Sequence, residues 1–237
     1  MCRLFGLRAT EPTKIECQLV HAQNALMEQS RENMTGRSHA HGWGLATYRR
    51  GLPYIEKRAW AAYHGEHFAK TAARSYSNIV IAHVRHATVG PATMENTHPF
   101  VHGRFAFAHN GTIPHFDLVR APMLADMDPL HRNEIYGSTD SEHIFRYLLS
   151  LWERNPGLPL VEVLGAGMQQ ILAWCRDIDP EAPASLNLLW SDGQQLVGSR
   201  FRRTLWYLER DGIHLCEICG KTHLHRSSGS YRAVEVA

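Results

Sequence analysis

The sequence contains no long apolar run, no leader-like amino terminus and no cluster of basic residues. Its apolar stretches are all shorter than the roughly 20 residues that span a bilayer, so we expect no transmembrane helix. The first residues do not combine a basic segment with an apolar one, so we expect no secretory signal. Lys and Arg are scattered along a chain of net charge +2, which argues against a nucleic-acid partner.

Cysteine is scarce, and its five residues form an odd, widely spaced set. Such a set is not the disulfide framework of a small secreted protein, and we expect a reduced, cytoplasmic setting. The chain has 237 residues, 44% of them hydrophobic, which is enough for a sizeable core. We interpret residues 1–237 as a single domain.

The predicted strands fall into two groups, with two long helices between them. This order is neither the regular alternation of a doubly wound sheet nor an all-β pattern, and it predicts an α+β fold of two mainly antiparallel sheets covered by helices. Strands are predicted at 2–8, 39–51, 53–59, 77–90 and 103–113, and later at 185–193, 194–201, 204–212 and 231–237; helices are predicted at 14–31, 65–77, 138–155 and 159–178.

The chain opens with MCRLFG, which places a cysteine directly behind the initiator methionine. If Met1 is removed, Cys2 carries a thiol and a free α-amine, and an amine with a pKa near 8 can take the thiol proton. The alternative is that Cys2 is a small apolar strand residue with no chemical role.

Three further segments contain groups that could act on an amino-acid amide. In AHNGTI, Asn110 and Gly111 form either a hairpin turn or a pair of oxyanion donors. In HVRHATVG, Arg85 could grip a carboxylate or pair with an acid in the protein. In STDSEHIF, Thr139 and Glu142 have capping-box spacing, and Asp140 suits either the helix dipole or a substrate ammonium group.

Taken together, these groups would bind an α-amino acid and attack its side-chain amide, and glutamine is the obvious such substrate. At this point the chain resembles the class II (amino-terminal nucleophile, Ntn) glutamine amidotransferases. It is most similar to their free-standing branch, which includes the γ-glutamyl hydrolase of ergothioneine biosynthesis. The matching pieces occur in the family's order: MCRLFG, HGWGLA, AHVRHATVG, ENTHPF, FAHNGTI and GSTDSEHIF.

The resemblance implies a four-layer αββα sandwich, the Ntn hydrolase fold, with the active site between the sheets. It implies that Cys2 is the nucleophile, that its α-amine is the base, and that Asn110 and Gly111 form the oxyanion hole. His98 in NTHPF is interpreted as structural support beside the site. The substrate-binding residues implied are Arg85 and Thr88 for the α-carboxylate, Asp140 for the α-ammonium group, and His86 in the pocket wall, where synthase relatives usually carry tryptophan.

The implied reaction cleaves the γ-amide of glutamine or of a γ-glutamyl compound through a cysteine thioester, without a cofactor. The substrate is a small molecule, and a separate synthase subunit could receive the ammonia because no synthase domain follows in this chain. Two alternatives stay open: hydrolysis of the γ-glutamyl amide of a specialised metabolite, and an inactive domain that serves as a metal-binding or interaction module.

A segment near the carboxyl end, CEICGKTHLH, supports the second alternative. Cys216 and Cys219 form a C-x₂-C pair, and His223 and His225 follow within the ten-residue segment. Zinc binding, a redox-active pair and an ordinary loop are all compatible with this pattern, because the ligand spacing is tighter than usual. We favour the loop, and we include no metal ligand in the predicted site.

Overall fold

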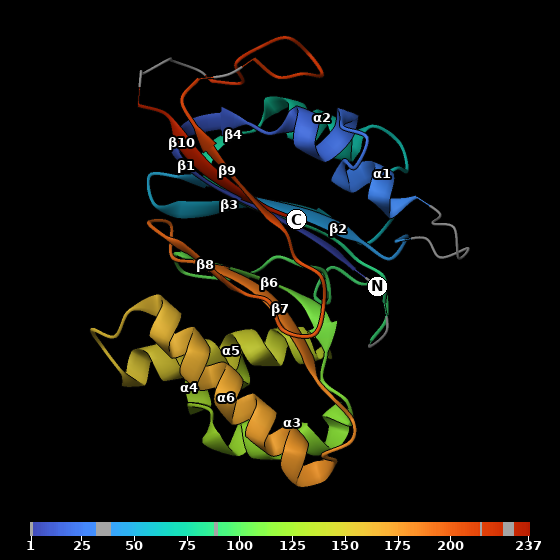
Figure 1. The fold of residues 1–237 in the computed structure, drawn as a ribbon. Helices are drawn as coiled ribbons and strands as arrows, with labels where there is room; N and C mark the ends of the chain where they lie inside the picture. Colours follow the sequence, from blue (N-terminus) through green and yellow to red (C-terminus); the bar gives the residue numbers. More distant parts are fainter. Residues whose placement is uncertain (1, 32–38, 88–89, 214, 225–229) are drawn as a thin grey trace.

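The computed structural model describes residues 2–31, 39–87, 90–213, 215–224 and 230–237. Two sheets lie face to face, and each outer face is covered by helices, which gives the order helices, sheet, sheet, helices (Figure 1). Every pair of neighbouring strands in the two sheets is antiparallel. The predicted α+β fold, a four-layer αββα sandwich, is confirmed.

The first sheet has six strands and includes both the first and the last strand of the described chain. Strand β1 lies at its centre, between β4 and the last strand, β10. The order across the sheet is β3 (Leu52–Arg58), β2 (Trp43–Arg49), β4 (Tyr76–Val84), β1 (Arg3–Lys14), β10 (Arg232–Val236) and β9 (Tyr207–Asp211).

The second sheet has four strands, and the helices on its outer face come from the middle of the chain (Figure 1). Its order is β5 (Phe100–His102), β6 (Phe105–Thr112), β7 (Ser185–Ser191) and β8 (Leu196–Ser199). The helices beneath it are α3 (Phe116–Asp126), α4 (Pro129–Asn133), α5 (Asp140–Arg154) and α6 (Leu160–Ile178), and those above the first sheet are η1 (Cys17–His21), α1 (Leu26–Ser30) and α2 (His67–Arg74).

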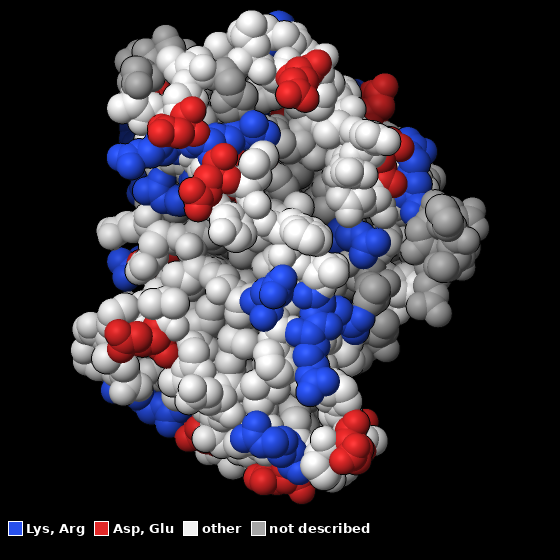
Figure 2. Space-filling view, viewed as in Figure 1, with Lys and Arg blue, Asp and Glu red and all other residues white. Residues whose placement is uncertain are grey.

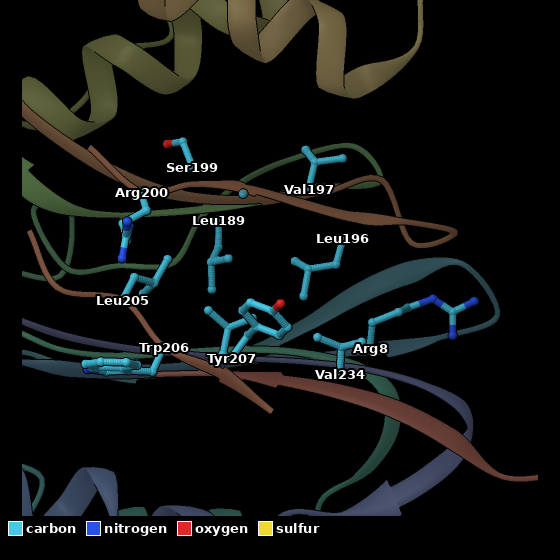
Figure 3. A pocket seen from close by; sticks show the side chains of 12 residues that line it. Arg8, Leu189, Leu196, Val197, Ser199, Arg200, Leu205, Trp206, Tyr207 and Val234 are labelled. Atoms are coloured by element: carbon cyan, nitrogen blue, oxygen red, sulfur yellow. The ribbon is translucent and has the colours of Figure 1, made fainter. Parts of the chain in front are cut away.

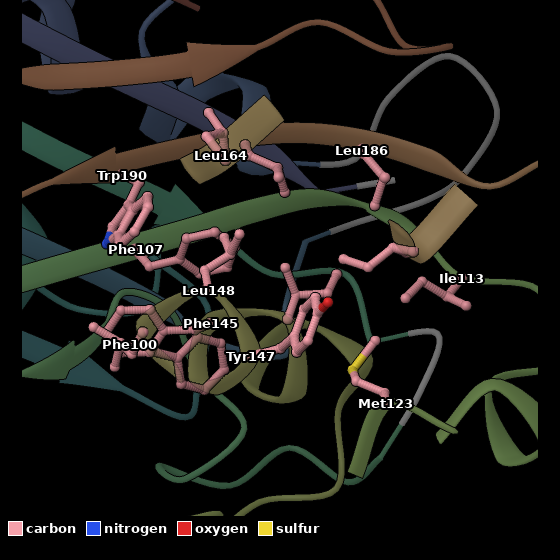
Figure 4. Close-up of a cluster of buried hydrophobic side chains, with 14 of the residues drawn as sticks. Phe100, Phe107, Ile113, Met123, Phe145, Tyr147, Leu148, Leu164, Leu186 and Trp190 are labelled. Atoms are coloured by element: carbon pink, nitrogen blue, oxygen red, sulfur yellow. The ribbon is translucent and has the colours of Figure 1, made fainter. Parts of the chain in front are cut away.

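Alternation along the strands assigns each side chain to one face. In β6, Phe105 and Phe107 pack with the helices of the outer layer, whereas Ala106 and Ala108 contact the first sheet. Figure 4 shows Phe107 and Phe145 of α5 side by side in the larger cluster, and their rings stack at 5.4 Å. Between the sheets, these alanines pack with larger side chains that include Leu4, Ile79 and Ile81.

Three sequence predictions were wrong in detail. Residues 14–31 do not form one helix, because the chain leaves η1 at Ala22 in an extended conformation before α1 begins. Of the two alternatives for Asn110 and Gly111, the hairpin turn is wrong: both residues lie inside β6, opposite Asn187 and Leu186 of β7. Helix α3 was not predicted, and its interior contains Pro122, a residue that normally argues against a helix.

Charged side chains of both signs are interspersed over the two ends of the face in Figure 2, with a small group of basic side chains near its middle. This face shows no extended basic track of the kind that follows a phosphate backbone. Among the described residues, no helix combines the length and the apolar character needed to cross a bilayer.

Candidate active site

Cys2 lies at the edge of the space between the two sheets. Further along the same strand, Leu4 packs between the sheets, and a Cβ added at Gly6 would lie 2.6 Å from the side chain of Leu189 in β7. Cys2 has the same parity as these two residues, so its side chain is directed toward the second sheet. It is partly exposed, whereas Leu4 is 4% exposed, so Cys2 marks the mouth of the sandwich.

The thiol of Cys2 is held by the backbone of His86. The His86 N–H donates to Sγ at 3.3 Å, and the thiol donates to the His86 carbonyl at 3.5 Å. Burial raises the pKa of the thiol, while the His86 N–H and the charge of Arg85 lower it and the charge of Asp140 raises it. Arg85 and Asp140, 55 positions apart in the chain, are therefore both electrostatic neighbours of Cys2.

Arg85 continues from the end of β4 and organises the loop that follows. It is 2% exposed, and its backbone N–H donates to the carbonyl of Gly42 at 2.7 Å. Its guanidinium donates to the carbonyls of Pro91 at 2.8 Å and Gly90 at 3.2 Å. Arg85 thus binds the backbone of residues 90 and 91; the predicted carboxylate ligand Thr88 lies outside the described residues.

Asn96 of the ENTHPF motif connects this loop to helix α5. Its Nδ2 donates to the Pro91 carbonyl at 3.2 Å, and its Oδ1 accepts from the Ser138 N–H at 2.8 Å. His98 is buried, with its ring 4.1 Å from that of His83. The motif therefore lies between the arginine loop and the start of α5, and the interpretation of His98 as a structural residue fits its burial.

Asp140 is the first residue of α5 and is 4% exposed. Its Oδ2 accepts from the Ile113 N–H at 2.9 Å, and its Oδ1 accepts from the N–H and hydroxyl of Ser141 at 2.8 and 3.2 Å. A carboxylate has about four acceptor positions, so these three hydrogen bonds leave capacity for a further donor.

The predicted capping box forms only in part. Thr139 accepts from the Glu142 N–H at 3.3 Å, as the spacing predicts. The Glu142 carboxylate instead accepts from the backbone N–H groups of Tyr136 and Gly137, at 3.0 and 2.6 Å. Glu142 thus fastens the segment before the helix, while Asp140 is directed toward the end of β6.

Asn110 and Gly111 occupy that end of β6. Ala106 and Ala108 contact the first sheet, and by strand alternation Asn110 is directed the same way, toward the mouth where Cys2 lies. Gly111 is required sterically, since an added Cβ would lie 1.8 Å from the Ser185 carbonyl oxygen. This arrangement brings an amide and an approachable backbone N–H to the rim of the space between the sheets.

His109 precedes Asn110 in β6, and its side chain is directed to the opposite face of the strand, toward α5. Its Nδ1 lies 3.0 Å from the Ser141 hydroxyl, and its Nε2 lies 3.0 Å from the Ser185 carbonyl oxygen. Burial lowers the pKa of His109, against the opposing effect of Asp140. This histidine ties β6 to β7 and to the helix that carries Asp140.

Two histidines that were not predicted lie against His86, the residue whose backbone holds the Cys2 thiol. The rings of His39 and His41 lie 5.9 and 5.5 Å from that of His86. The Nδ1 of His41 accepts from the Ala87 N–H at 3.0 Å, and burial lowers its pKa, as do the charges of His86 and Arg85. The only sequence signal is the His-x-His spacing in HAHGWGLA, which by itself predicts no contact with a residue 45 positions later.

A cavity of about 680 Å³ lies elsewhere between the sheets (Figure 3). Leu189, Leu196, Trp206 and Tyr207 contribute apolar side chains to it, and Arg8 lies at its margin. Arg8 is six residues from Cys2 along β1, a distance of about 20 Å at the rise of an extended strand. No predicted site residue lines this cavity, so it is separate from the candidate active site.

Comparisons with known proteins identify the family to which this chain is similar. Residues 1–218 match the model of the family described as class II glutamine amidotransferases. The probable glutamine amidotransferase DUG3 of Saccharomyces cerevisiae is 27% identical over 98% of this chain and 71% of its own length. The uncharacterized protein MJ1515 of Methanocaldococcus jannaschii is 32% identical over 89% of this chain, which spans about half (54%) of that protein.

Two further comparisons cover most of both proteins. The gamma-glutamyl-hercynylcysteine sulfoxide hydrolase of Mycobacterium tuberculosis is 27% identical over 91% of this chain and 83% of its own length. Among solved structures, a glutamine aminotransferase class-II domain protein from Silicibacter pomeroyi superposes with a TM-score of 0.62 at 20% identity, over 100% of this chain and 88% of that one. This structural likeness supports the fold.

Proposed function

Because the chain belongs to the family of class II glutamine amidotransferases, we propose that it cleaves the γ-amide of glutamine or of a γ-glutamyl compound through a thioester on Cys2. The observation that carries the proposal is the position of the thiol. Cys2 lies at the mouth of the sandwich, with the cation of Arg85 and the anion of Asp140 both acting on it. A zwitterionic amino acid presents the complementary pair of charges.

Asp140 is proposed to bind the α-ammonium group of the substrate. Its carboxylate retains an acceptor position after its bonds to Ile113 and Ser141, and burial strengthens a charge-assisted hydrogen bond there.

Arg85 and Thr88 are proposed to bind the α-carboxylate. Since the Arg85 guanidinium already donates to Gly90 and Pro91, its contribution includes shaping the loop that offers donors to that carboxylate. His86, whose backbone contacts the thiol, is proposed to form the wall of the pocket.

The proposed reaction begins after removal of Met1, when the α-amine of Cys2 takes the thiol proton. The thiolate attacks the γ-carbonyl carbon, and the carbonyl oxygen becomes an oxyanion that accepts hydrogen bonds from the Asn110 amide and the Gly111 N–H. The carbon–nitrogen bond then breaks, and the leaving amine takes the proton held by the α-amine. The products are ammonia or an amine and a γ-glutamyl thioester on Cys2.

Water completes the cycle. The α-amine accepts a proton from the attacking water, a second oxyanion forms in the same place, and the carbon–sulfur bond breaks. The thiolate leaves and recovers the proton from the α-amine, while glutamate is released. No cofactor takes part in this scheme, and every proton transferred to the α-amine is returned.

The leaving group decides the biological role. A synthase subunit that receives ammonia is one candidate partner, and an amine leaving group would make the protein a γ-glutamyl hydrolase. We favour hydrolysis of a γ-glutamyl amide, because the similarity to the mycobacterial hydrolase extends over 83% of that protein. The similarity to a glutamine–fructose-6-phosphate aminotransferase of Acanthamoeba polyphaga mimivirus covers 35% of this chain and 13% of that protein.

The test is intact-mass analysis before and after treatment with 6-diazo-5-oxo-norleucine, a glutamine analogue that alkylates nucleophilic cysteines. We expect loss of Met1 and one adduct on Cys2. Cys2→Ala should take up no adduct, and Cys175→Ala, which alters a buried cysteine on α6, should be labelled like the parent protein. A chain that retains Met1 and takes up no adduct would contradict the proposal and favour an inactive module.

A further inference from the structure

Three cysteines and a histidine from opposite ends of the chain converge outside the candidate active site. Cys17 begins η1, whereas Cys216, Cys219 and His223 belong to the segment between β9 and β10. One ligand atom from each residue, three Sγ atoms and an imidazole nitrogen, lies within 4.8 Å of every other. The sequence pattern offered His225 as a ligand, but His225 lies outside the described residues, and Cys17 was not recognised.

The fold creates this cluster by docking the segment before β10 on the end of β1. The Lys14 N–H donates to the His223 carbonyl at 2.7 Å, and Thr13 forms a β-bridge with Leu224. Three residues after Lys14, the chain enters the single π-helical turn that starts with Cys17. Turns of this type often occur at functional sites.

The C-x₂-C segment is folded into a compact turn. The Cys216 N–H donates to the Lys221 carbonyl and the Gly220 N–H donates to the Cys216 carbonyl, both at 2.8 Å. The Ile218 N–H donates to the Sγ of Cys216 at 3.4 Å. A backbone N–H that donates to sulfur stabilises the thiolate form, which is the form that binds a metal.

The position of His223 adds the fourth donor. Its backbone has φ +59°, in the left-handed region that non-glycine residues seldom adopt, and its Nε2 lies 3.0 Å from the Sγ of Cys219. These two atoms are closer than two ligands of one zinc ion, so binding of the ion would move them apart slightly. In a tetrahedral site with Zn–S near 2.3 Å and Zn–N near 2.0 Å, ligand atoms are about 3.5–3.8 Å apart.

Ionised thiols at this spacing require a compensating positive charge. Burial and the neighbouring thiols raise the pKa of Cys17 to about 12. Burial also opposes ionisation of Cys216, but hydrogen bonds from the backbone of Cys219 and Ile218 and from the neighbouring thiols together lower the pKa of Cys216. Three thiols in contact cannot all ionise without a compensating positive charge, and a bound divalent metal supplies it.

The types of ligand atom in the cluster indicate which metal would bind. Three thiolates and one imidazole are soft and borderline ligands, which favour zinc over magnesium or calcium. Four protein ligands close a tetrahedron and leave no position for water or substrate, so the site is structural in type. Three thiolate ligands give the zinc complex a charge of −1, and the cation of Arg210, whose guanidinium donates to Glu235 at 2.8 Å, is also an electrostatic neighbour of Cys216.

We propose that Cys17, Cys216, Cys219 and His223 bind one zinc ion, which fastens the β9–β10 segment to the end of β1. A cavity of about 500 Å³, lined in part by Cys17, Cys216 and His223, gives the ion a path from solvent. Cys2 lies at the opposite end of β1, so the site supports the central strand of the first sheet without entering the chemistry. The inference is independent of the proposed function.

The first experiment measures zinc in the full chain, expressed without a histidine tag and purified without chelator. Elemental analysis should give about one zinc per chain, and in Cys17→Ser/Cys219→Ser the content should fall about tenfold or more. Two matched controls should each retain one zinc: Cys175→Ser, which removes a cysteine from α6, and Cys2→Ser, which removes the proposed nucleophile.

A second experiment keeps the inference testable if the double variant fails to fold. Cobalt exchanged into the parent protein should give the visible bands of a tetrahedral site together with sulfur-to-metal charge-transfer absorption. The single variant Cys17→Ser should lose about one third of that charge-transfer intensity, because one of three thiolates is removed. Metal-free parent protein, iron in place of zinc, or a Cys216–Cys219 disulfide in freshly purified protein would each overturn the proposal.

Discussion

The thiol of Cys2 and the backbone of His86 hydrogen-bond to each other in both directions, at 3.3 Å for the N–H donor and 3.5 Å for the carbonyl acceptor. The N–H favours the thiolate, and the carbonyl favours the neutral thiol. Attack on a substrate therefore requires the S–H···O bond to break while the N–H···S bond persists. The same backbone segment can hold the nucleophile in both of its protonation states.

The first prediction concerns the titration of this thiol. Burial raises the pKa of Cys2 and the charge of Asp140 raises it further, so the rate of alkylation by iodoacetamide should climb on the alkaline side. In Asp140→Asn the negative charge is gone, and the midpoint should move to lower pH. Mass-spectrometric rates at Cys2 over a pH series measure the shift. Glu142→Gln is the control, because Glu142 is not among the groups that act on the thiol; an equal shift in both variants would contradict the assignment.

Asn110→Ala should lower kcat about 10²–10³-fold, because one oxyanion donor is lost. The side chain is partly exposed at the end of β6, so the melting temperature should stay close to that of the parent protein. The control is Asn187→Ala on the paired strand, whose amide binds Thr204 and Phe201. That variant should lose about 1–3 kcal/mol of unfolding free energy. A kcat loss in Asn187→Ala as large as in Asn110→Ala would argue against a specific oxyanion role.

Gly111→Ala should destabilise the fold by about 3 kcal/mol or more, because the new Cβ would lie 1.8 Å from the Ser185 carbonyl oxygen and 2.3 Å from the His109 ring. Gly165 in α6 offers the matched substitution, since nothing lies within 4 Å of an added Cβ there. Gly165→Ala should stabilise the protein by about 0.5–1 kcal/mol. Urea unfolding of both variants gives the comparison, and similar midpoints would contradict the close β6–β7 approach.

Asp140→Asn should raise KM for the γ-glutamyl substrate about 10–100-fold, as expected for loss of a charge-assisted hydrogen bond of about 1.5–3 kcal/mol. Glu142→Gln removes a carboxylate from the same helical turn, where it also accepts two backbone N–H bonds. Its effect should appear in stability, with KM nearly unchanged. Steady-state kinetics on both variants separates the roles, and a normal KM in Asp140→Asn would exclude ammonium binding there.

Buried histidines should make the fold sensitive to acid. Burial lowers the pKa of His83 to about 3, against 6.5 in an unfolded chain. Between pH 6.5 and pH 3, the unfolded chain therefore binds a proton at His83 and the folded protein does not. The free energy of unfolding falls as the pH drops through this range, by about 1.4 kcal/mol per pH unit for one such group. Unfolding at pH 7 and pH 5 should show a smaller decrease in His83→Gln than in the parent protein. The exposed His64→Gln should leave the decrease unchanged.

Local sequence patterns were sufficient to predict the main strands and helices that form the layers of the sandwich. The continuous β-branched run of β4, the alternation in β6 and the capped start of α5 predicted these elements to within one or two residues of their starts, because each pattern is local in the sequence. The Asn110–Gly111 pair was harder, since the same dipeptide normally turns. Its place inside a strand depends on the pairing with Asn187 and Leu186, which lie 75 or more positions later.

Tertiary contacts account for what the sequence could not reveal. The Arg85 guanidinium was predicted to bind substrate, and nothing local indicates that it donates to Gly90 and Pro91. The sequence around Cys17 predicts only a buried apolar residue. Cys17 lies beside Cys216 and Cys219 because residues 215–224 pack against the end of β1. Long-range placement of this kind has no signature in one sequence.

The position of β10 has a consequence for how the protein is made. Strand β1 is paired on one side by β4 and on the other by β10, which follows it in the chain by more than 200 residues. A nascent chain can pair β1 with β4 while translation continues, but the other edge of β1 stays open until residues 232–236 have left the ribosome. Ribosome-bound chains halted before that point should expose this edge to chaperones.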